Sequence, residues 1–560
     1  MQNPAAPSVC ESNPDAPALR TLDELPGPRG IPLLGNALEL KPKELHRLIG
    51  SWADRFGPLF VFRVATTRIL TIADAETIQQ VLRDRPERFR RWRRLEGIAT
   101  DIKADGLFTA EGAEWKRQRK FVMHALNGGH LREFIPRLEQ VVGRLRRRWW
   151  RAALAGTPID VHVDLMRLTV DVTSGLAFGK DLNSLEEQVD PIQNHLDKIF
   201  PAVARRVTAL FPYWRYLPLP ADREAADAVK EIGGIIDGLI AETRARLAAN
   251  SELRTRPRNL LEALIAAQEQ DGEEGPRDDE IAANVMTLLL AGEDTTANSI
   301  SYMVHFLMQY PRVQAAVQEE VDRVIGMADQ PWQDPTTPDR LRYIEAFAHE
   351  AMRCKPVAGH VLFLEPNEDV RIRDVFVPKG TPILALSAHL GTQEENFAQP
   401  QEFRPERWLK GAEHHDGAHN AKAFMPFGAA PRTCPGRQLA MLQIKMVMAM
   451  LCRDFEISAP EDASPMEDIY NFTVGPVHVY ATLRPRGTVR RGIDIELRVG
   501  ERRVVIHPIP FSDRRVSDRR QARARAVELR VGERRGEIRP IPFPDRRFAD
   551  RRRQGARTAA

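Results

Sequence analysis

Residues 427–436 read FGAAPRTCPG, and the interpretation of the whole chain starts from this stretch. A helix is predicted to begin directly after Cys434, with Pro435 at its first position, where the missing N–H costs nothing. Cys434 would then be the N-cap, and the free N–H groups from Gly436 onward, with the helix dipole, would stabilise a thiolate. The pattern favours a metal-binding thiolate, whereas a lone cysteine in other surroundings is more often buried and inert.

The residues before the cysteine carry a family resemblance. Phe427 is flat, the residues after it are small, and Arg432 places a cation two residues before the sulfur. The stretch resembles the haem-binding loop of the cytochrome P-450 family, Phe-x-x-Gly-x-Arg-x-Cys-x-Gly, with Ala430 where the family usually has glycine. The resemblance implies that Cys434 ligates the iron of haem b and that Phe427, Arg432 and Gly436 contact the cofactor.

Three charged residues match a second family feature. Glu350 and Arg353, in HEAMRCKP, lie three apart on a predicted helix, so their side chains meet on one face. A surface ion pair of this kind contributes little to stability. By resemblance, however, Arg407 in FRPERW completes a buried structural network with them on the proximal side of the haem.

A long apolar segment contains polar residues at its centre. Residues 281–310 predict a helix of about 30 residues that runs through the core. Ala291, Gly292, Asp294 and Thr295 lie in its middle, where buried polar groups need partners. The segment resembles the oxygen-binding groove of the family, which implies cofactor contact for Ala291 and Gly292 and proton delivery by Asp294 and Thr295. A core helix whose threonines bond to the preceding turn is the alternative.

Two further motifs lie upstream. Trp115 and Arg119 are four residues apart, share a helical face, and are both hydrogen-bond donors suited to carboxylates. By resemblance, they and Arg432 bind the haem propionates. PGPRGIPLLGN at 26–36 resembles the proline-rich segment that precedes the first helix in longer members of the family.

Composition is compatible with a large intracellular enzyme. The chain has 560 residues, of which 43% are hydrophobic, so it can bury a large core. Its four cysteines show no disulfide framework, and no run of 18 apolar residues occurs. We therefore expect a soluble, cytoplasmic, bacterial-type member without a transmembrane anchor.

The charge is divided unevenly along the chain. Residues 484–560 contain 23 arginines, no lysine and ten acidic residues, whereas residues 1–483 contain 58 basic and 67 acidic ones. Within this tail, the 26 residues from Ile495 recur from Val527, an offset of 32. Each copy holds one short alternating segment and one PIPF turn, too little to fold alone. The tail is either disordered or an arm that binds an acidic protein, an anionic surface or the body of the same chain.

The expected fold is mainly α with small β-sheets, the cytochrome P-450 fold, with a long central helix over the haem. A flexible segment at 1–25 is followed by the catalytic domain at 26–483 and the tail at 484–560. A hairpin is predicted at 59–73 and short strands near 371–376 and 473–483. Helices are predicted near 43–56, 112–126, 130–154, 221–249, 257–269, 281–310, 339–354 and 435–453.

The resemblance implies a haem-thiolate monooxygenase that inserts one atom of O2 into a hydrophobic substrate. Fatty acids, terpenoids and steroid-like molecules all stay open as substrates. Electrons would come from NAD(P)H through a separate ferredoxin or flavodoxin, steered by proximal cations. Those cations are Arg117, Lys120, Arg437 and Lys445. The substrate-pocket residues implied by family position are Phe108, Leu288, Val357, His360, Phe363 and Val474.

Two alternative functions are compatible with the same cysteine loop. A haem-thiolate isomerase or peroxygenase would share the loop, but such enzymes typically lack the acid and alcohol found at Asp294 and Thr295. A non-catalytic haem sensor with an anion-binding tail would explain the arginines and leave that pair unused.

Overall fold

The computed structural model describes residues 19–41, 44–186, 191–209, 211–326, 328, 331–358, 362–409, 419–471, 473–486, 495–499 and 502–506. His360 and the second tail repeat lie outside the described residues. The chain divides into two units, Met1–Arg486 and Gly487–Ala560, and each is described by itself.

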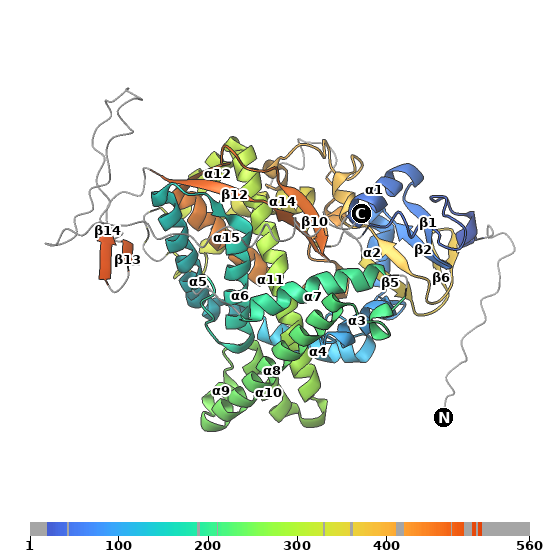
Figure 1. Cartoon of the computed structure of the whole chain (residues 1–560), viewed down its shortest axis with the longest axis horizontal. Helices are drawn as coiled ribbons and strands as arrows, with labels where there is room; N and C mark the ends of the chain where they lie inside the picture. Colours follow the sequence, from blue (N-terminus) through green and yellow to red (C-terminus); the bar gives the residue numbers. More distant parts are fainter. Residues whose placement is uncertain are drawn as a thin grey trace, which may run out of the picture. The chain divides into compact units, whose positions relative to one another are not determined.

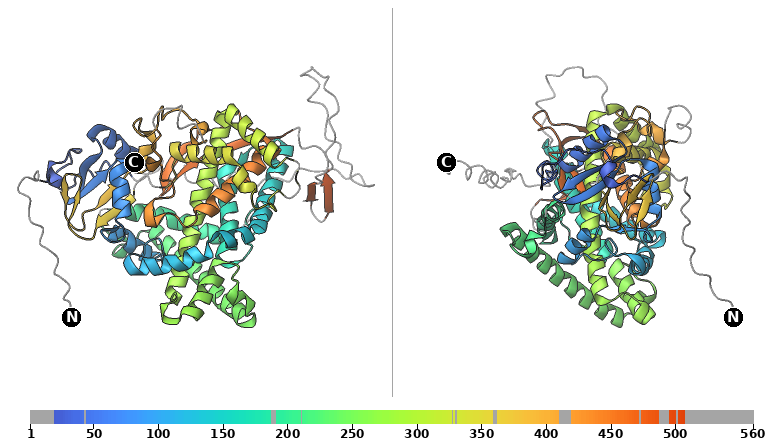
Figure 2. Two further views of the ribbon diagram at one scale, coloured as in Figure 1. Left: turned by 180° about the vertical axis from the view of Figure 1, so that it is seen from behind. Right: turned by 90° about the vertical axis from the view of Figure 1, so that its right-hand side faces the viewer.

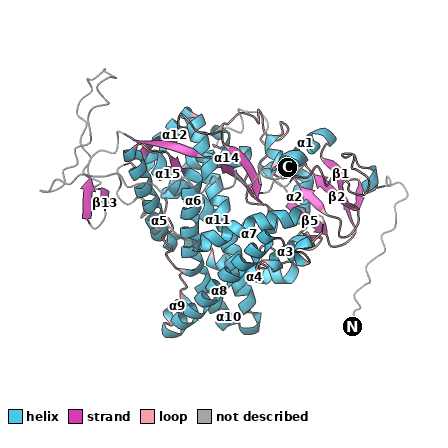
Figure 3. Cartoon of the chain, viewed as in Figure 1, coloured by secondary structure: helices cyan, strands magenta, loops and turns pink. Residues whose placement is uncertain are grey.

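The first unit is mainly helical (Figure 3). Its helices are α1 (Leu45–Phe56), α2 (Ala75–Arg83), α3 (Arg93–Asp101), α4 (Gly112–Ala125), α5 (Gly128–Ala155), α6 (Val161–Phe178), α7 (Pro191–Thr208), α8 (Pro220–Ala249), α9 (Glu252–Thr255), α10 (Leu260–Asp271), α11 (Asp278–Gln309), α12 (Pro311–Val324), α13 (Thr337–Arg340), α14 (Arg342–Cys354) and α15 (Arg437–Asp454).

Small sheets accompany these helices, which confirms the predicted fold class. The strands are β1 (Leu59–Val64), β2 (Thr67–Ile72), β3 (Phe89–Arg91), β4 (Ile159–Asp160), β5 (Leu362–Pro366), β6 (Val370–Ile372), β7 (Val375–Val377), β8 (Ile383–Ala385), β9 (Phe455–Ser458), β10 (Glu467–Asn471), β11 (Thr473–Val477) and β12 (Tyr480–Pro485). The largest sheet has the order β1-β2-β8-β5-β3, and β1 and β2 form the predicted hairpin.

Helix α11 is the centre of this unit. It contacts α6, α8, α14, α15 and β11, and Figure 1 shows it passing among them, with α8 and α10 side by side at one end in Figure 2. It is apolar on nearly all sides, so packing against many neighbours removes its side chains from water. Gly292 allows close approach, because a Cβ there would lie 2.8 Å from the Thr173 hydroxyl of α6.

Helix α6 was not among the predicted helices. Its residues from Leu168 to Phe178 are all buried, so it lacks the polar stripe that marks an amphipathic helix. Its burial against α11 matters for the site described below. A helix buried on every side carries no 3.6-residue pattern from which it could be recognised.

The ends of the first unit extend beyond the predicted limits. Arg20, within the segment expected to be flexible, pairs with Asp374 at 2.6 Å and bridges to Val375 of β7. At the other end, Arg486 donates two hydrogen bonds to Asp322 and one to the carbonyl of Cys452 at 2.7 Å. Contacts with neighbouring elements therefore hold the described chain at Arg20 and at Arg486.

The second unit contains one described hairpin. Strands β13 (Ile495–Val499) and β14 (Arg502–Ile506) pair antiparallel, with Ile495 opposite Ile506. The alternating segment of the first repeat, predicted as one short element, therefore forms two strands. A lone two-stranded hairpin is marginally stable in water at best.

Candidate functional site

The cysteine loop closes on itself. The Cys434 N–H donates to the Phe427 carbonyl at 2.8 Å. Helix α15 begins at Arg437, with Gly436 as its N-cap, so the prediction that Pro435 opens the helix was wrong by two residues. The N–H groups of Gly436 and Arg437 nevertheless reach the sulfur. The loop thus presents Cys434 just before the helix, within reach of its first amides.

The protonation of Cys434 depends on two opposed effects. The residue is exposed, yet desolvation by the surrounding protein raises the pKa of its thiol. The amides of Gly436 and Arg437 and the charge of Arg119 lower that pKa, but by less. The helix terminus assists a thiolate without producing one alone, so a bound metal cation would have to supply the remaining stabilisation.

Ala430 adopts a conformation that normally requires glycine. Its φ is +57°, in the left-handed region, which an L-residue occupies at a cost of about 1 kcal/mol. This explains why a glycine suits this place in the loop pattern. With alanine in place of glycine, the backbone at this position still forms a hydrogen bond, because the Ala430 carbonyl accepts from the Thr433 hydroxyl at 2.8 Å.

The predicted propionate-binding residues do come together. The guanidinium of Arg432 lies 4.4 Å from the centre of the Trp115 ring. Arg119 donates to the carbonyl of Thr433 at 2.8 Å, and Arg432 donates to the carbonyl of Ala110 at 2.8 Å. Helix α4 and the cysteine loop, about 320 residues apart in the sequence, therefore form one surface.

Two arginines that the sequence analysis missed belong to the same cluster. Arg85 binds Glu111 at 2.9 Å, and Arg432 binds the other oxygen of that carboxylate. Burial, then repulsion from Arg85 and Arg432, lowers the pKa of Arg91 to about 9. For Arg91 the sequence signal was the basic run RFRRWRR at 88–94, which by itself indicates a solvated basic segment, and Arg85 lies outside that run.

This guanidinium cluster, defined as Arg85, Arg91, Arg119 and Arg432, fits a group with two carboxylates. Among the described residues, the Nε atoms of Arg85, Arg91 and Arg432 are buried without a hydrogen-bond partner. Burial, then repulsion from Arg85, lowers the pKa of Arg432 to about 10. Within this cluster, only the guanidiniums of Arg85 and Arg432 bind Glu111 directly, and Arg91 reaches this carboxylate through its backbone N–H. The propionates of haem would match the remaining positive charge and the unused donors.

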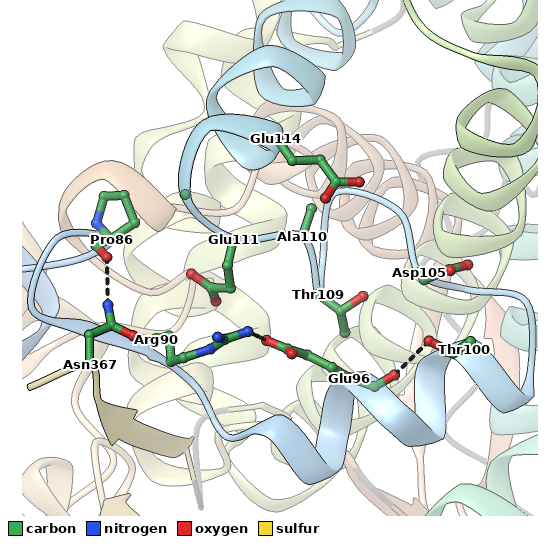
Figure 4. Close-up of a pocket in the computed structure, with 11 residues that line it drawn as sticks. Pro86, Arg90, Glu96, Thr100, Asp105, Thr109, Ala110, Glu111, Glu114 and Asn367 are labelled. Carbon is green, nitrogen blue, oxygen red and sulfur yellow. Dashed lines mark hydrogen bonds and ion pairs between the residues drawn. The ribbon is translucent and has the colours of Figure 1, made fainter. Parts of the chain in front are cut away.

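A polar pocket adjoins the cluster. It has a volume of about 480 Å³, and Figure 4 shows Arg90, Glu96 and Glu111 among the side chains that line it. Glu111 is shared, because the same carboxylate lines the pocket and accepts from Arg85 and Arg432. The predicted substrate-pocket residues do not line it, so it is not the apolar pocket expected from the sequence.

The predicted structural network forms as a set. Glu350 and Arg353 are fully buried, and their side chains pair at 2.8 Å. Arg407 donates to Glu350 at 3.0 Å, and the Trp408 indole donates to its other oxygen at 2.9 Å. The pKa of Glu350 is lowered, because these guanidiniums outweigh the effect of burial. Arg353 also bonds the carbonyls of Gly391, Pro400 and Glu402, which ties α14 to the following loops.

Asp294 and Thr295, the two residues predicted to deliver protons, have different hydrogen-bond partners. Thr295 donates back to the Ala291 carbonyl at 2.9 Å, and α11 stays α-helical through this turn. Asp294 accepts from the Asn298 amide at 2.7 Å and from the Thr473 hydroxyl of β11. Desolvation raises the pKa of Asp294, and its neutral donors and His162 lower it by less. Asp294 is thus a carboxyl that favours its protonated form more than an exposed aspartate does.

The predicted substrate-pocket residues are only partly gathered. Leu288 and Phe363 are half-buried against one apolar cluster, and Phe363 stacks on Trp92. Phe108 is 39% exposed, with the Arg91 guanidinium 3.8 Å from its ring centre. Val357 and Val474 are buried and joined by a backbone hydrogen bond of 2.8 Å.

Three of the four cations predicted to steer a redox partner form ion pairs within the chain, among them Lys120, which lies 3.7 Å from Asp271. Lys445 is buried and binds Glu345 at 2.8 Å, so its assignment to an accessible surface was wrong. Arg117 pairs with the buried carboxylate of Glu280. Lys120 and Arg437 are exposed. The prediction for Lys445 was wrong because a sequence does not show which cations form ion pairs inside the protein.

A cysteine at a helix start, a buried cation cluster and a buried Glu-Arg-Arg network together define a haem-thiolate protein. A family model described as Cytochrome P-450 matches residues 25–481, and the chain belongs to the cytochrome P-450 family of monooxygenases. The family implies a haem cofactor.

The relatives share the whole catalytic region. Mouse cytochrome P-450 3A25 is 28% identical over 78% of this chain and 86% of its own length. Rabbit cytochrome P-450 3A6 is 27% identical over 77% of this chain and 85% of its own. Human cytochrome P-450 2A13 is 26% identical over 82% and 91%. These are animal proteins, so they give no support to the expectation of a bacterial-type member.

Within the described part of the chain, each helix is either too short or too polar to cross a membrane.

Proposed function

We propose that this enzyme inserts one oxygen atom of O2 into a hydrophobic small molecule, using haem b and electrons from NAD(P)H. A separate ferredoxin or flavodoxin system would deliver the electrons. The observation that carries this proposal is Asp294, a carboxyl with a raised pKa on α11, one residue before Thr295. A haem protein that does not reduce O2 has no need of such a proton donor.

Each group of residues has a separate part in the proposal. Cys434 holds the iron, and the guanidinium cluster holds the propionates, which fixes the cofactor against α4 and the cysteine loop. When bound, thiolate-ligated haem supplies the chemistry that activates oxygen. Asp294 would hold a proton for delivery, and the Thr295 hydroxyl, which donates to the Ala291 carbonyl in this structure, would turn to pass it on.

Ligation is the first point to test. The reduced, carbon-monoxide-bound protein should show the red-shifted Soret band of thiolate ligation. Cys434→His should lose that band, whereas Cys354→Ser and Cys452→Ser should keep it. A chain that ends at Arg486 should also keep it, because the contacts of Arg486 with Asp322 and Cys452 are retained.

Turnover is the second measurement in the same experiment. Purified protein supplied with a ferredoxin or flavodoxin reductase system and a panel of hydrophobic substrates should consume reductant and form an oxygenated product. A spectrum of histidine-ligated type would end the proposal. Product formed only from added hydrogen peroxide would point to a peroxygenase instead.

A further inference from the structure

A chain of hydrogen bonds leads from Asp294 to a histidine on another helix. The Asn298 side-chain N–H group donates to Asp294 at 2.7 Å, and the Asn298 oxygen lies 2.8 Å from Nε2 of His162. The Thr473 hydroxyl donates to the second oxygen of Asp294. Three elements therefore meet at one carboxyl: α11, the first turn of α6 and the first residue of β11.

The partners fix the direction of each bond. Asn298 is 1% exposed, and its nitrogen donates to Asp294, so its oxygen must be the acceptor toward α6. Nε2 of His162 must then carry the proton that it donates. His162 thus prevents the Asn298 amide from turning over, a rotation that would place an oxygen against the Asp294 carboxylate.

Gly475 of strand β11 packs against the side-chain amide of Asn298. A Cβ built at Gly475 would lie 2.7 Å from the Asn298 oxygen and 2.8 Å from its nitrogen. Both distances are shorter than ordinary van der Waals contact, so an alanine there would displace the amide. Because Gly475 does not have a positive φ, an alanine would act through this contact and not through backbone strain.

We propose that His162 is a positioning residue for the distal proton donor, acting through Asn298 to orient the Asp294 carboxyl. This inference rests on the proposed function, because it assigns His162 a place in proton delivery. His162 is half-buried at the start of α6, and no cofactor contact is required of it. What it supplies is one N–H donor at a fixed point.

The test compares variants in the haem-loaded protein. His162→Leu removes the donor, His162→Gln restores an N–H without a titratable ring, and Gly475→Ala displaces Asn298 directly. His130→Gln is the matched control, because His130 also lies in the first turn of a helix and contacts an asparagine side chain. Two quantities are measured: the hydrogen peroxide released per reductant consumed, and the infrared carboxyl band that Asp294→Asn removes.

His162→Leu and Gly475→Ala should each shift that carboxyl band and raise peroxide release on the order of tenfold. His162→Gln and the control should resemble the wild type. If His162→Leu leaves both readouts unchanged, or if His162→Gln fails as badly as His162→Leu, the positioning role is wrong.

The infrared band does not require turnover. A wild-type protein without thiolate ligation or product would therefore refute the proposed function and still leave the contact between His162 and Asp294 measurable. A wild type that turns over normally, with variants that match it in both readouts, would refute this inference alone.

Discussion

Glu350 and Asp294 are two carboxylates withdrawn from water, and they respond in opposite ways. Glu350 is fully buried, yet its pKa is lowered, because Arg353 and Arg407 surround it with positive charge. Asp294 is less buried, yet its pKa is raised, because neutral donors from Asn298 and Thr473 compensate only part of its lost hydration. Partner charge, more than depth, decides whether a buried acid holds an ion or a proton.

The comparison separates structural from chemical roles. An ionised carboxylate between two guanidiniums is stable as a set and has no proton to give. A carboxyl with a raised pKa and two oriented donors keeps a proton more readily than an exposed aspartate does, and it is therefore suited to transferring one. Substitutions at Glu350 should therefore lower stability, whereas substitutions at Asp294 should lower the coupling of reductant use to product formation.

The largest effect is expected at Glu350. Glu350→Gln leaves two buried guanidiniums without a counter-charge and should lower the free energy of unfolding by about 3 to 5 kcal/mol. Chemical denaturation of the haem-loaded protein measures this change. Arg342→Met, at an exposed position of the same helix, is the control and should change stability little. If Glu350→Gln lowered the free energy of unfolding no more than Arg342→Met does, the structural network assigned to Glu350 would be wrong.

Asp294→Asn should damage function more than stability. Folding raises the pKa of this acid, so its ionisation does not stabilise the folded state, and a neutral amide should cost within about 1 kcal/mol. Coupled product formation should fall about a hundredfold, because the proton donor is lost. Thr295→Ala should show the same uncoupling. Product and peroxide are measured against reductant consumed, and unchanged coupling would mean that water replaces the side chain.

His349 extends the comparison to a base. Burial among Trp408 and Phe424 lowers its pKa to about 4, so the unfolded chain binds a proton that the folded chain rejects between about pH 4 and 6.5. The free energy of unfolding should therefore be highest above the unfolded pKa of His349 and should fall by about 2 kcal/mol between pH 7 and pH 5, because only the unfolded chain gains the proton. His349→Phe should flatten the dependence of the free energy of unfolding on pH by that amount, as measured by chemical denaturation across this pH range.

The smallest effect is expected in the cysteine loop. Ala430→Gly relieves a φ of +57° and should raise the free energy of unfolding by about 1 kcal/mol. Ala429 is the matched control, since its φ is −145°, which any residue adopts. Ala429→Gly should instead destabilise slightly, because the unfolded chain gains freedom. Equal effects at both positions would show that backbone strain at Ala430 is not felt.

The sequence predicted the local features well. Helices α1, α5 and α8 were predicted within a few residues, because a 3.6-residue pattern of apolar residues is present in the sequence, and α11 was predicted from its long apolar run. Helices α2 and α12 also have one apolar face, yet they were not predicted. Helix α6 was not predicted, because its residues from Leu168 to Phe178 are buried on every side and leave no polar stripe. The start of α15 was misplaced, since Pro435 is permitted at the first helical position but not obliged to occupy it.

Short motifs in the sequence were enough to indicate the family, to predict Cys434 as the iron ligand and to predict the Glu350 network. Other contacts became known only from the folded structure. Arg85 and Arg91 lie beside Arg432. His162, through Asn298, and Thr473 both contact Asp294, and Lys445 forms an ion pair with Glu345. All these contacts join residues about 100 or more positions apart. Their distances, and the charges that set each pKa, arise only when the helices pack, so no local pattern can encode them.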